Sequence, residues 1–337
     1  MNYFIFGGTG FIGTHLSSLL HEVHPETRIY NLDIIEPGTP LPTVKNYKPA
    51  LRKGEEHAAT FIYCDVRQPI ELEKVDITPD DVIFNFAAVH RTPGHPDPAY
   101  FETNIRGAEN VCAFAERHGI RKIVFTSSIA PYGAAEELKE ETTLPMPNTP
   151  YGISKLVAEK IHQTWQAGGE GRQLTIVRPG VVFGRGENGN FTRLYWGIRG
   201  HKFMYPGRKD TIKACIYVKE LVRFMLYRLE HHDSGVELYN CCYEPAYTIE
   251  HIVESMKRVT NMKVKVPFMP GWLIMTAAGI AGALGSPMGI CPARVRKLQI
   301  STNICGKKLS ASGYRFHYTF EEALADWYKD NGNLYLQ

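Results

Sequence analysis

Short apolar segments alternate with longer segments of helical periodicity through the first half of the chain. Aliphatic, β-branched and aromatic residues dominate five runs, each of which predicts a buried strand: 3–6, 28–32, 60–63, 82–86 and 122–125. Apolar residues at helical spacing follow the first strand, at 11–20, and precede the last, at 99–118. This alternation predicts an α/β fold built on a doubly wound parallel sheet with right-handed crossovers.

A glycine loop joins the first predicted strand to the first predicted helix. Gly7 permits a tight turn, Gly10 removes a side chain where a pyrophosphate must approach the backbone, and Gly13 lets helix and strand pack closely. Phe11 and Ile12 begin the helix, whose free N–H groups and partial positive charge favour phosphate. The loop therefore predicts a dinucleotide site, although a flexible turn would show the same glycines.

Carboxylates and small residues follow the next strands. Asp33 stands twenty residues after Gly13, where a carboxylate binds a ribose 2′-hydroxyl and repels a 2′-phosphate, so NAD is expected rather than NADP. A turn residue after a strand is the alternative. Asp65 suits either the adenine amino group or a helix cap. Ala87 and Ala88 leave room for a cofactor across the strand ends.

Hydroxyl groups and a Tyr-x-x-x-Lys pair follow the strand at 122–125. Thr149 and Pro150 suit the N-cap and first position of a helix that carries Tyr151 and Lys155 on one face. A phenol with a pKa of about 10 is a poor base at neutral pH, and a neighbouring ammonium favours its phenolate. With a serine from the segment 126–133, this pair predicts a proton-transfer site beside a hydride acceptor. A solvated helix face is the alternative for the pair alone.

Composition excludes several other classes of protein. The 337 residues are 44% hydrophobic and 22% charged, and the net charge of +3 is too small for a nucleic-acid surface. Seven cysteines without C-x-x-C spacing and thirteen histidines without a ligand pattern predict reduced thiols and no metal site. Because the first strand begins at residue 2, no signal peptide is expected, and a cytoplasmic location is predicted.

Together these motifs resemble the extended short-chain dehydrogenase/reductases, specifically the NAD-dependent epimerase/dehydratase family. The resemblance runs over nearly the whole chain, through the glycine loop, Asp65-Val66, the Thr-Ser-Ser segment, Tyr-x-x-x-Lys and the Arg-Pro-Gly segment at 178–184. It implies that Ser128 is the catalytic serine, Tyr151 the acid/base, and Lys155 its electrostatic partner and a ligand of the nicotinamide ribose. It also implies that Val66 and Pro179 border NAD.

The resemblance implies two parts and a dimer. A Rossmann-type NAD-binding domain would span 1–183, with 208–235 returning to it, and a smaller, discontinuous substrate-binding part would comprise 184–207 and 236–337. Members of the family are commonly homodimers, packed through helices that correspond to 99–118 and 151–166.

Departures from the family pattern narrow the reaction. Ile129-Ala130 replaces the Asp-Glu pair of sugar-nucleotide 4,6-dehydratases, and neither residue transfers a proton, which argues against that reaction. Val181 and Lys213 replace the Asn and Arg with which epimerases hold the substrate diphosphate. The predicted substrate contacts, each of which an ordinary surface residue would also explain, are Ser127, His90, Asn190, Arg208 and Arg294.

An apolar stretch without charges covers 266–293. Prolines and glycines interrupt it, and its longest helical run is too short to span a bilayer. One interpretation is an apolar helix over the substrate pocket or a dimer seam. The other is a peripheral membrane contact through 270–287, with Trp272 in the interface and basic flanks on anionic lipid, which would suit a lipid-linked sugar.

Three functions remain in competition. The first is an NAD-dependent sugar-nucleotide epimerase, in which the C4 alcohol is oxidised by hydride transfer to NAD and re-reduced from the other face, with Tyr151 as acid/base. The second is an NAD(P)-dependent dehydrogenase or reductase of the 3β-hydroxysteroid or dihydroflavonol type, or an epimerase or reductase acting on a lipid-linked sugar. The third is a nucleotide-sensing regulator, against which the intact Ser128, Tyr151 and Lys155 argue.

Overall fold

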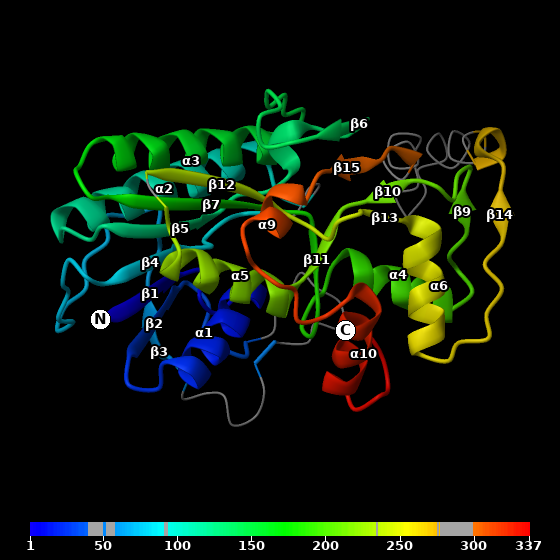
Figure 1. The fold of residues 1–337 in the computed structure, drawn as a ribbon, viewed down its shortest axis with the longest axis horizontal. Coiled ribbons are helices and arrows are strands. Elements are labelled where there is room, and N and C mark those ends of the chain that lie inside the picture. Colours follow the sequence, from blue (N-terminus) through cyan, green and yellow to red (C-terminus); the bar gives the residue numbers. More distant parts are fainter. Residues whose placement is uncertain (40–49, 52–57, 91–93, 234, 275, 277–298) are drawn as a thin grey trace.

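A seven-stranded parallel sheet forms the larger part of the computed structural model, which describes residues 1–39, 50–51, 58–90, 94–233, 235–274, 276 and 299–337 (Figure 1). Its strand order is β12-β7-β5-β4-β1-β2-β3, and every neighbouring pair is parallel. The strands are β1 (Asn2–Phe6), β2 (Arg28–Asp33), β3 (Thr60–Tyr63), β4 (Val82–Asn85), β5 (Lys122–Thr126), β7 (Gln173–Pro179) and β12 (Val236–Cys241). The predicted doubly wound α/β fold is confirmed.

Helices cover both faces of this sheet. Helices α1 (Phe11–Val23) and α5 (Val218–Glu230) lie on one face, and α2 (Asp97–Arg117) and α3 (Pro150–Ala167) lie on the other (Figure 1). The central strand β1 shows why its sequence is continuously apolar: Tyr3 and Ile5 point into the first core, while Phe4 and Phe6 point into the second. The strand is therefore buried on both sides.

Helix α3 begins where the sequence predicts. The Thr149 hydroxyl accepts a hydrogen bond from the Gly152 N–H at 3.1 Å, and Pro150 occupies the first helical position. Its buried face is unusually polar and includes Lys155, Glu159 and His162. Polar groups at such a face need partners inside the protein, and these partners define the candidate site.

The smaller part is a mixed sheet of short strands surrounded by helices. The strand order is β13-β10-β15-β6, from β6 (Ala135–Lys139), β10 (Ile212–Lys213), β13 (Tyr247–Thr248) and β15 (Thr302–Ile304). Two further pairs join β8 (Val181–Phe183) to β11 (Cys215–Tyr217), and β9 (Tyr205–Pro206) to β14 (Phe268–Met269). The remaining helices are η1 (Ala130–Tyr132), α4 (Asn190–Arg199), α6 (Ile249–Val259), α9 (Lys307–Ala311) and α10 (Phe320–Asp330).

A third core, rich in aromatic rings, holds the smaller part together. Phe183 stacks on Phe191 with ring centroids 4.8 Å apart, and Trp327 and Phe320 pack around them. Strand β12 belongs to the seven-stranded sheet, although the sequence analysis placed 236–337 in the substrate-binding part. Its six residues pair with β7, so the larger part extends at least to Cys241 in the structure.

Among the described residues, no helix is both long and apolar enough to cross a membrane. Of the predicted peripheral contact at 270–287, residues 275 and 277–287 lie outside the described residues.

Candidate active site

The glycine loop turns sharply at the carboxyl end of β1. Gly7 has a φ of +77°, and a Cβ atom there would lie 2.7 Å from the backbone nitrogen of Ala87, so this position requires glycine. Gly13 is equally constrained, because its Cβ would lie 2.6 Å from Gly8. Gly10 is the N-cap of α1 and offers no side chain to the first N–H groups. The loop therefore leaves the helix N-terminus available to an anion.

Asp33 lies beside this loop at the end of β2. Its carboxylate accepts hydrogen bonds from the backbone N–H of Thr9 at 3.3 Å, of Ile34 at 2.8 Å and of Ile35 at 3.3 Å. Burial raises the pKa of Asp33, and these hydrogen bonds oppose the rise. The structure thus brings the predicted ribose ligand against the predicted pyrophosphate loop.

Asp65, predicted to contact the adenine, and Val66, predicted to border NAD, have partners within the protein. Both oxygens of the Asp65 carboxylate accept hydrogen bonds from the Arg67 guanidinium, the shortest at 2.6 Å, and this hydrogen bonding lowers the pKa of Asp65. Val66 is buried against Gly107, where a Cβ would lie 2.9 Å from the valine side chain. The contact of Asp65 with adenine stays a prediction, since Arg67 competes for its oxygens.

Hydrogen bonds of Asn104 connect the segment after β4 to helix α3. The Asn104 side chain on α2 accepts from the Val89 N–H at 2.8 Å and donates to the Val89 carbonyl at 3.1 Å. The same amide donates to Ser154 on α3 at 2.8 Å. Ala87 lies against Gly7, Ala88 follows it directly before Val89, and the neighbouring His90 is exposed.

Ser128, Tyr151 and Lys155 converge at the carboxyl end of β5. Burial raises the pKa of Tyr151 to about 12, and a hydrogen bond with the Ser128 side chain opposes this rise. The Ser128 hydroxyl also accepts from the Ala130 N–H at 3.1 Å. Lys155 is 2% exposed, and its Nζ lies 4.5 Å from the centre of the Phe125 ring. Burial lowers the pKa of this lysine to about 7, and the Glu159 carboxylate opposes the fall.

Glu159 lies one turn beyond Lys155 on the same face of α3 and is the centre of a buried hydrogen-bond network. It accepts a hydrogen bond from Ser127 at 2.5 Å and two from Arg178, at 2.8 and 2.5 Å. Arg178 also lies over the Tyr132 ring, 4.6 Å from its centre. The Ser127 hydroxyl, predicted to contact substrate, is thus 2% exposed and engaged inside the protein.

Sequence reasoning missed the pairing of Glu159 with Arg178. The signal was the spacing: Tyr151, Lys155 and Glu159 recur every four residues and therefore share a helix face. Pairing could not be deduced, because Arg178 comes from a different element, β7.

The other predicted substrate residues are not brought together. Arg208 donates to Glu136 at 2.8 Å and to Asp210 at 3.0 Å, and Asn190 is exposed and accepts from Arg193 at 2.8 Å. Arg294 lies outside the described residues. Pro179 ends β7 near the site and pairs with Cys241 of β12.

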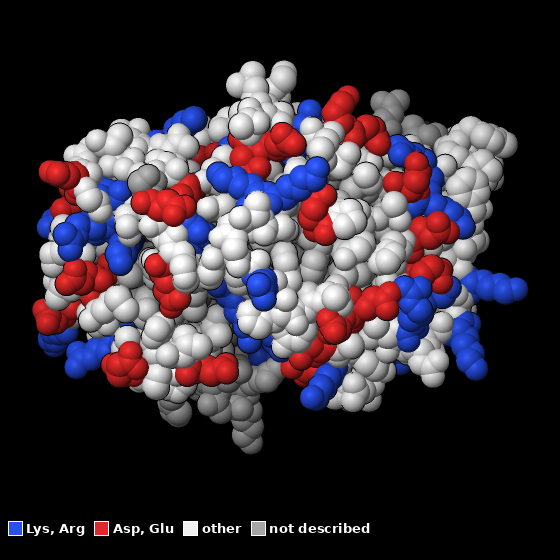
Figure 2. Space-filling view, viewed as in Figure 1, with Lys and Arg blue, Asp and Glu red and all other residues white. Residues whose placement is uncertain are grey.

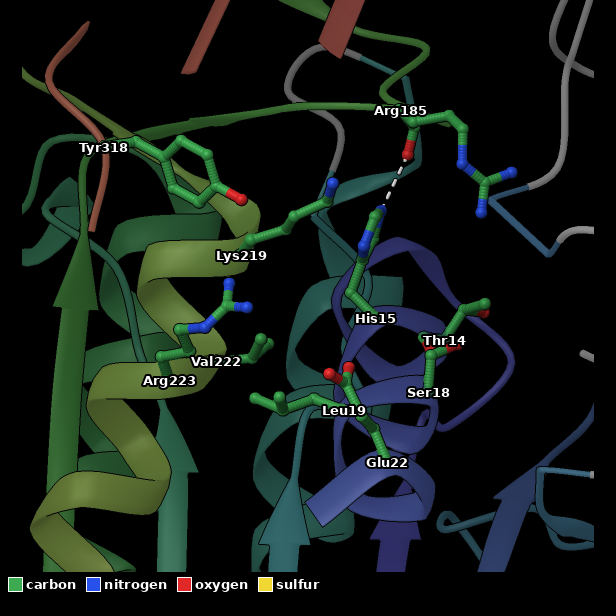
Figure 3. Close-up of a pocket in the computed structure, with 10 residues that line it drawn as sticks. All are labelled: Thr14, His15, Ser18, Leu19, Glu22, Arg185, Lys219, Val222, Arg223 and Tyr318. Carbon is green, nitrogen blue, oxygen red and sulfur yellow. Dashed lines mark hydrogen bonds between the residues drawn. The ribbon is translucent and has the colours of Figure 1, made fainter. Parts of the chain in front are cut away.

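A separate cavity of about 170 Å³ lies between α1 and α5 (Figure 3). His15 faces it and is hydrogen-bonded to the Arg185 carbonyl at 2.8 Å, while burial lowers its pKa to about 4 and keeps it neutral near pH 7. Lys219 at the same cavity binds Asp326 at 2.5 Å and Asp330 at 2.9 Å. These contacts connect α5 to α10 at the cavity, which lies apart from Tyr151, Lys155 and Glu159 on α3.

Comparison with known proteins identifies the family. The sequence model of the NAD dependent epimerase/dehydratase family matches residues 3–242. The chain belongs to this family. It is therefore an NAD-dependent enzyme of the extended short-chain dehydrogenase/reductase type, and NAD is its cofactor.

Two relatives and one structure illustrate the similarity. N-acetyl-alpha-D-glucosaminyl-diphospho-ditrans,octacis-undecaprenol 4-epimerase of Escherichia coli O157:H7 is 30% identical over 96% of this chain and 93% of its own length. UDP-glucose 4-epimerase of Lacticaseibacillus casei is 30% identical over 80% of this chain and 85% of its own. UDP-glucuronic acid 4-epimerase from Bacillus cereus, in complex with UDP-glucuronic acid and NAD, shares the fold with a TM-score of 0.73, at 18% identity over 99% and 100% of the two chains.

Proposed function

We propose that this enzyme is an NAD-dependent 4-epimerase of a sugar whose anomeric carbon carries a diphosphate, as in a nucleotide sugar. The observation that carries the proposal is the convergence of Ser128, Tyr151 and Lys155 at the sheet edge that also holds the glycine loop. Both relatives described above are named as 4-epimerases of diphospho-sugars, which favours this reaction over an unspecified oxidoreduction.

The geometry fits NAD. The turn at Gly7 has no room for a Cβ, and the N-terminus of α1 lacks a side-chain cap, so the backbone there suits a pyrophosphate. Asp33 would hold the adenosine ribose, and Lys155 the nicotinamide ribose. When bound, NAD supplies a hydride acceptor that takes hydrogen from C4 and later returns it.

The proton chemistry falls to Tyr151. Its phenolate would take the proton of the C4 hydroxyl as the alcohol becomes a ketone, and its phenol would return a proton when the ketone is reduced from the opposite face. Ser128 would hydrogen-bond the same sugar oxygen in both states. Because burial, opposed by the hydrogen bond with Ser128, raises the pKa of Tyr151 to about 12, the phenolate needs a nearby positive charge, and Lys155 on the next turn would supply it when protonated.

The sugar diphosphate can be attached either to a nucleoside or to a polyprenol. The Lys213 ammonium donates to the Ile300 carbonyl at 2.7 Å, and Val181 offers no polar side chain, so two positions used by nucleotide-sugar epimerases lack their usual donors. The E. coli relative acts on a polyprenol-linked sugar by its name and matches 96% of this chain, whereas the UDP-glucose 4-epimerase matches 80%. A polyprenyl diphosphate sugar is therefore the second candidate substrate.

Turnover assays with both carriers test the proposal. UDP-N-acetylglucosamine and undecaprenyl diphosphate N-acetylglucosamine are each incubated with the enzyme and catalytic NAD, and the released sugars are separated by chromatography. We expect the galacto epimer, no net NADH, and a loss of turnover of roughly 10²–10⁴-fold in Tyr151→Phe with NAD binding retained. Tyr132→Phe, which removes a hydrogen bond to Asn240 at 2.9 Å and a contact of the hydroxyl with Arg178, is the matched control and should stay within a few-fold of wild type. Stoichiometric NADH and a ketone product would identify a dehydrogenase instead.

We also infer a homodimer through α2 and α3. Ile153 and Val157 lie one turn apart on α3 and are 40% and 36% exposed, which leaves an apolar strip on the helix surface. Light scattering should give twice the mass of the chain, and Ile153→Lys with Val157→Lys should give a monomer.

A further inference from the structure

Charge is distributed very unevenly along this chain. Residues 255–320 contain ten lysines and arginines and no aspartate or glutamate, whereas the rest of the chain contains 28 basic and 35 acidic residues. The net charge of +3 therefore conceals a strongly basic segment within an otherwise acidic protein. A segment of this kind is suited to an anionic partner.

Residues 260–274 of this segment run along one end of the molecule (Figure 1). After α6 the chain passes to β14 and then to a short helix that begins at Gly271 (Figure 1). Alternate residues of the connection point inward: Val264 and Val266 pack against the third core, while Lys263 and Lys265 are exposed. Figure 2 shows lysine and arginine side chains projecting at this end.

Apolar side chains are exposed further along the same segment. Trp272 is 71% exposed, Phe268 51% and Leu273 42%, whereas Trp165 and Trp327 are buried in the cores. Lys263 and Lys265 form no ion pair with any described residue, in contrast to Lys257, which binds Glu254 at 2.9 Å. We call Lys263, Lys265, Phe268, Trp272 and Leu273 the basic-apolar edge.

Aromatic and aliphatic groups in the same segment as unpaired lysines fit a membrane interface better than they fit a nucleic acid. Trp and Phe enter the boundary between headgroups and acyl chains, and the lysine ammonium groups meet anionic headgroups. A nucleic-acid surface would use aromatic rings interleaved with a continuous basic groove, and Leu273 contributes nothing to such a site.

A series of contacts connects the edge to strand β6. The short helix sits against the turn after β9, where a Cβ on Gly207 would lie 2.9 Å from Gly271. Arg208 in that turn binds Glu136 of β6 at 2.8 Å. Strand β6 begins three residues after η1, which itself follows Ser128, so Arg208 links the turn beside the edge to the segment that follows Ser128.

We propose that the basic-apolar edge docks this enzyme on an anionic lipid bilayer, so that a sugar diphosphate carried by a membrane lipid reaches the site from the bilayer surface. The inference rests on the proposed epimerase function for its substrate, but the docking itself is measured without turnover.

Vesicle flotation of the full-length enzyme with its NAD tests the docking. Vesicles of phosphatidylcholine with phosphatidylglycerol are compared with vesicles of phosphatidylcholine alone, at low and high salt. We expect binding to the anionic vesicles only, weakened by salt. Lys263→Glu with Lys265→Glu should lower the partition at least roughly 25-fold, since each basic residue near the surface contributes roughly fivefold. Trp272→Glu should lower it roughly tenfold or more.

Matched variants separate docking from general effects. Arg28→Glu with Lys74→Glu makes the same charge change at exposed positions elsewhere, and Leu334→Glu introduces a charge at an apolar side chain that is 64% exposed. For both variants, the fraction of protein bound to anionic vesicles should lie within about twofold of the value expected from the change in net charge alone. Unchanged thermal unfolding and unchanged turnover of UDP-N-acetylglucosamine in the edge variants would show that fold and site are intact.

Several results would overturn the proposal. These are no flotation of the wild type, equal flotation on neutral vesicles, equal loss in the matched variants, or retention of a DNA oligonucleotide in place of vesicles. Epimerisation of a soluble sugar diphosphate with no flotation would refute docking alone, whereas flotation without any epimerisation would refute the proposed function alone.

Discussion

Replacing Lys155 with methionine should stabilise the protein in the absence of NAD while it abolishes turnover. Lys155 is 2% exposed, and burial lowers its pKa from an ordinary value of 10.5 to about 7, against the opposing influence of Glu159. Burying the Lys155 ammonium group therefore lowers the free energy of unfolding, because this group is fully hydrated in the unfolded chain. Methionine fills a similar volume without a charge.

The sign and size of the effect follow from proton linkage. Between about pH 7 and 10.5 the unfolded chain holds a proton on Lys155 that the folded chain has lost, so the stability of the wild type rises with pH in this window. Each pH unit is worth about 1.4 kcal/mol, reduced near pH 7 where the folded group is half protonated. Wild type should thus gain about 2 kcal/mol from Lys155 between pH 7 and pH 9, and Lys155→Met should gain none of it.

Urea unfolding of both proteins without NAD, near pH 7 and near pH 9, measures this difference. All other groups titrate in both proteins and cancel, so the advantage of Lys155→Met should shrink by about 2 kcal/mol at the higher pH. Lys160→Met, an exposed lysine on the same helix, is the matched control and should show no such change. An advantage that is equal at both pH values, or a variant less stable at both, would refute the reasoning.

Three further outcomes are expected. Asp33→Asn removes the charge that repels a 2′-phosphate, so fluorescence titrations should show the preference for NAD over NADP narrowed roughly tenfold or more, and an unchanged ratio would count against Asp33 as ribose ligand. Glu159→Ala leaves Arg178 buried and unpaired and should lower the free energy of unfolding by about 3–5 kcal/mol, with partial recovery when Arg178→Met is added; no recovery would contradict the pairing. Gly7→Ala should lower the free energy of unfolding by about 1–3 kcal/mol more than Gly332→Ala does. Both glycines have a positive φ, but only at Gly7 is there no space for a Cβ atom; an equal decrease for both variants would argue against the tight turn.

The sequence predicts the seven-stranded sheet well, because its strands have clear hydrophobic patterns, but it does not predict the short strands of the smaller part. Strands β1, β2 and β4 are buried on both faces and therefore read as continuous apolar runs between helical segments. Strands β9, β10, β13 and β14 have two residues each, too few to show any period, so these strands of the smaller part could not be predicted. The placement of β12 depends on its pairing with β7, which no local pattern records.

In the candidate site, too, local patterns could be predicted from the sequence but contacts between distant segments could not. Tyr151 and Lys155 are predictable because helix periodicity alone puts them on one face. Whether Arg208 is available to a substrate could not be predicted. Its guanidinium donates a hydrogen bond to Glu136, 72 residues away in the sequence, and sequence spacing does not indicate that contact. Ser127 and Ser128 are adjacent in sequence, yet only the fold decides that Ser127 turns inward to Glu159.

The face of α3 that carries Tyr151, Lys155 and Glu159 also constrains how such an enzyme can evolve. Only catalysis requires Tyr151 and Lys155 together, and loss of Lys155 relieves a buried charge, so a lineage that abandons catalysis moves toward a more stable protein by discarding the lysine. Glu159 has no such freedom, since it neutralises Arg178 beneath the site. Descendants that survive as inactive binding proteins are therefore expected to retain the glutamate and arginine after the tyrosine and lysine have gone.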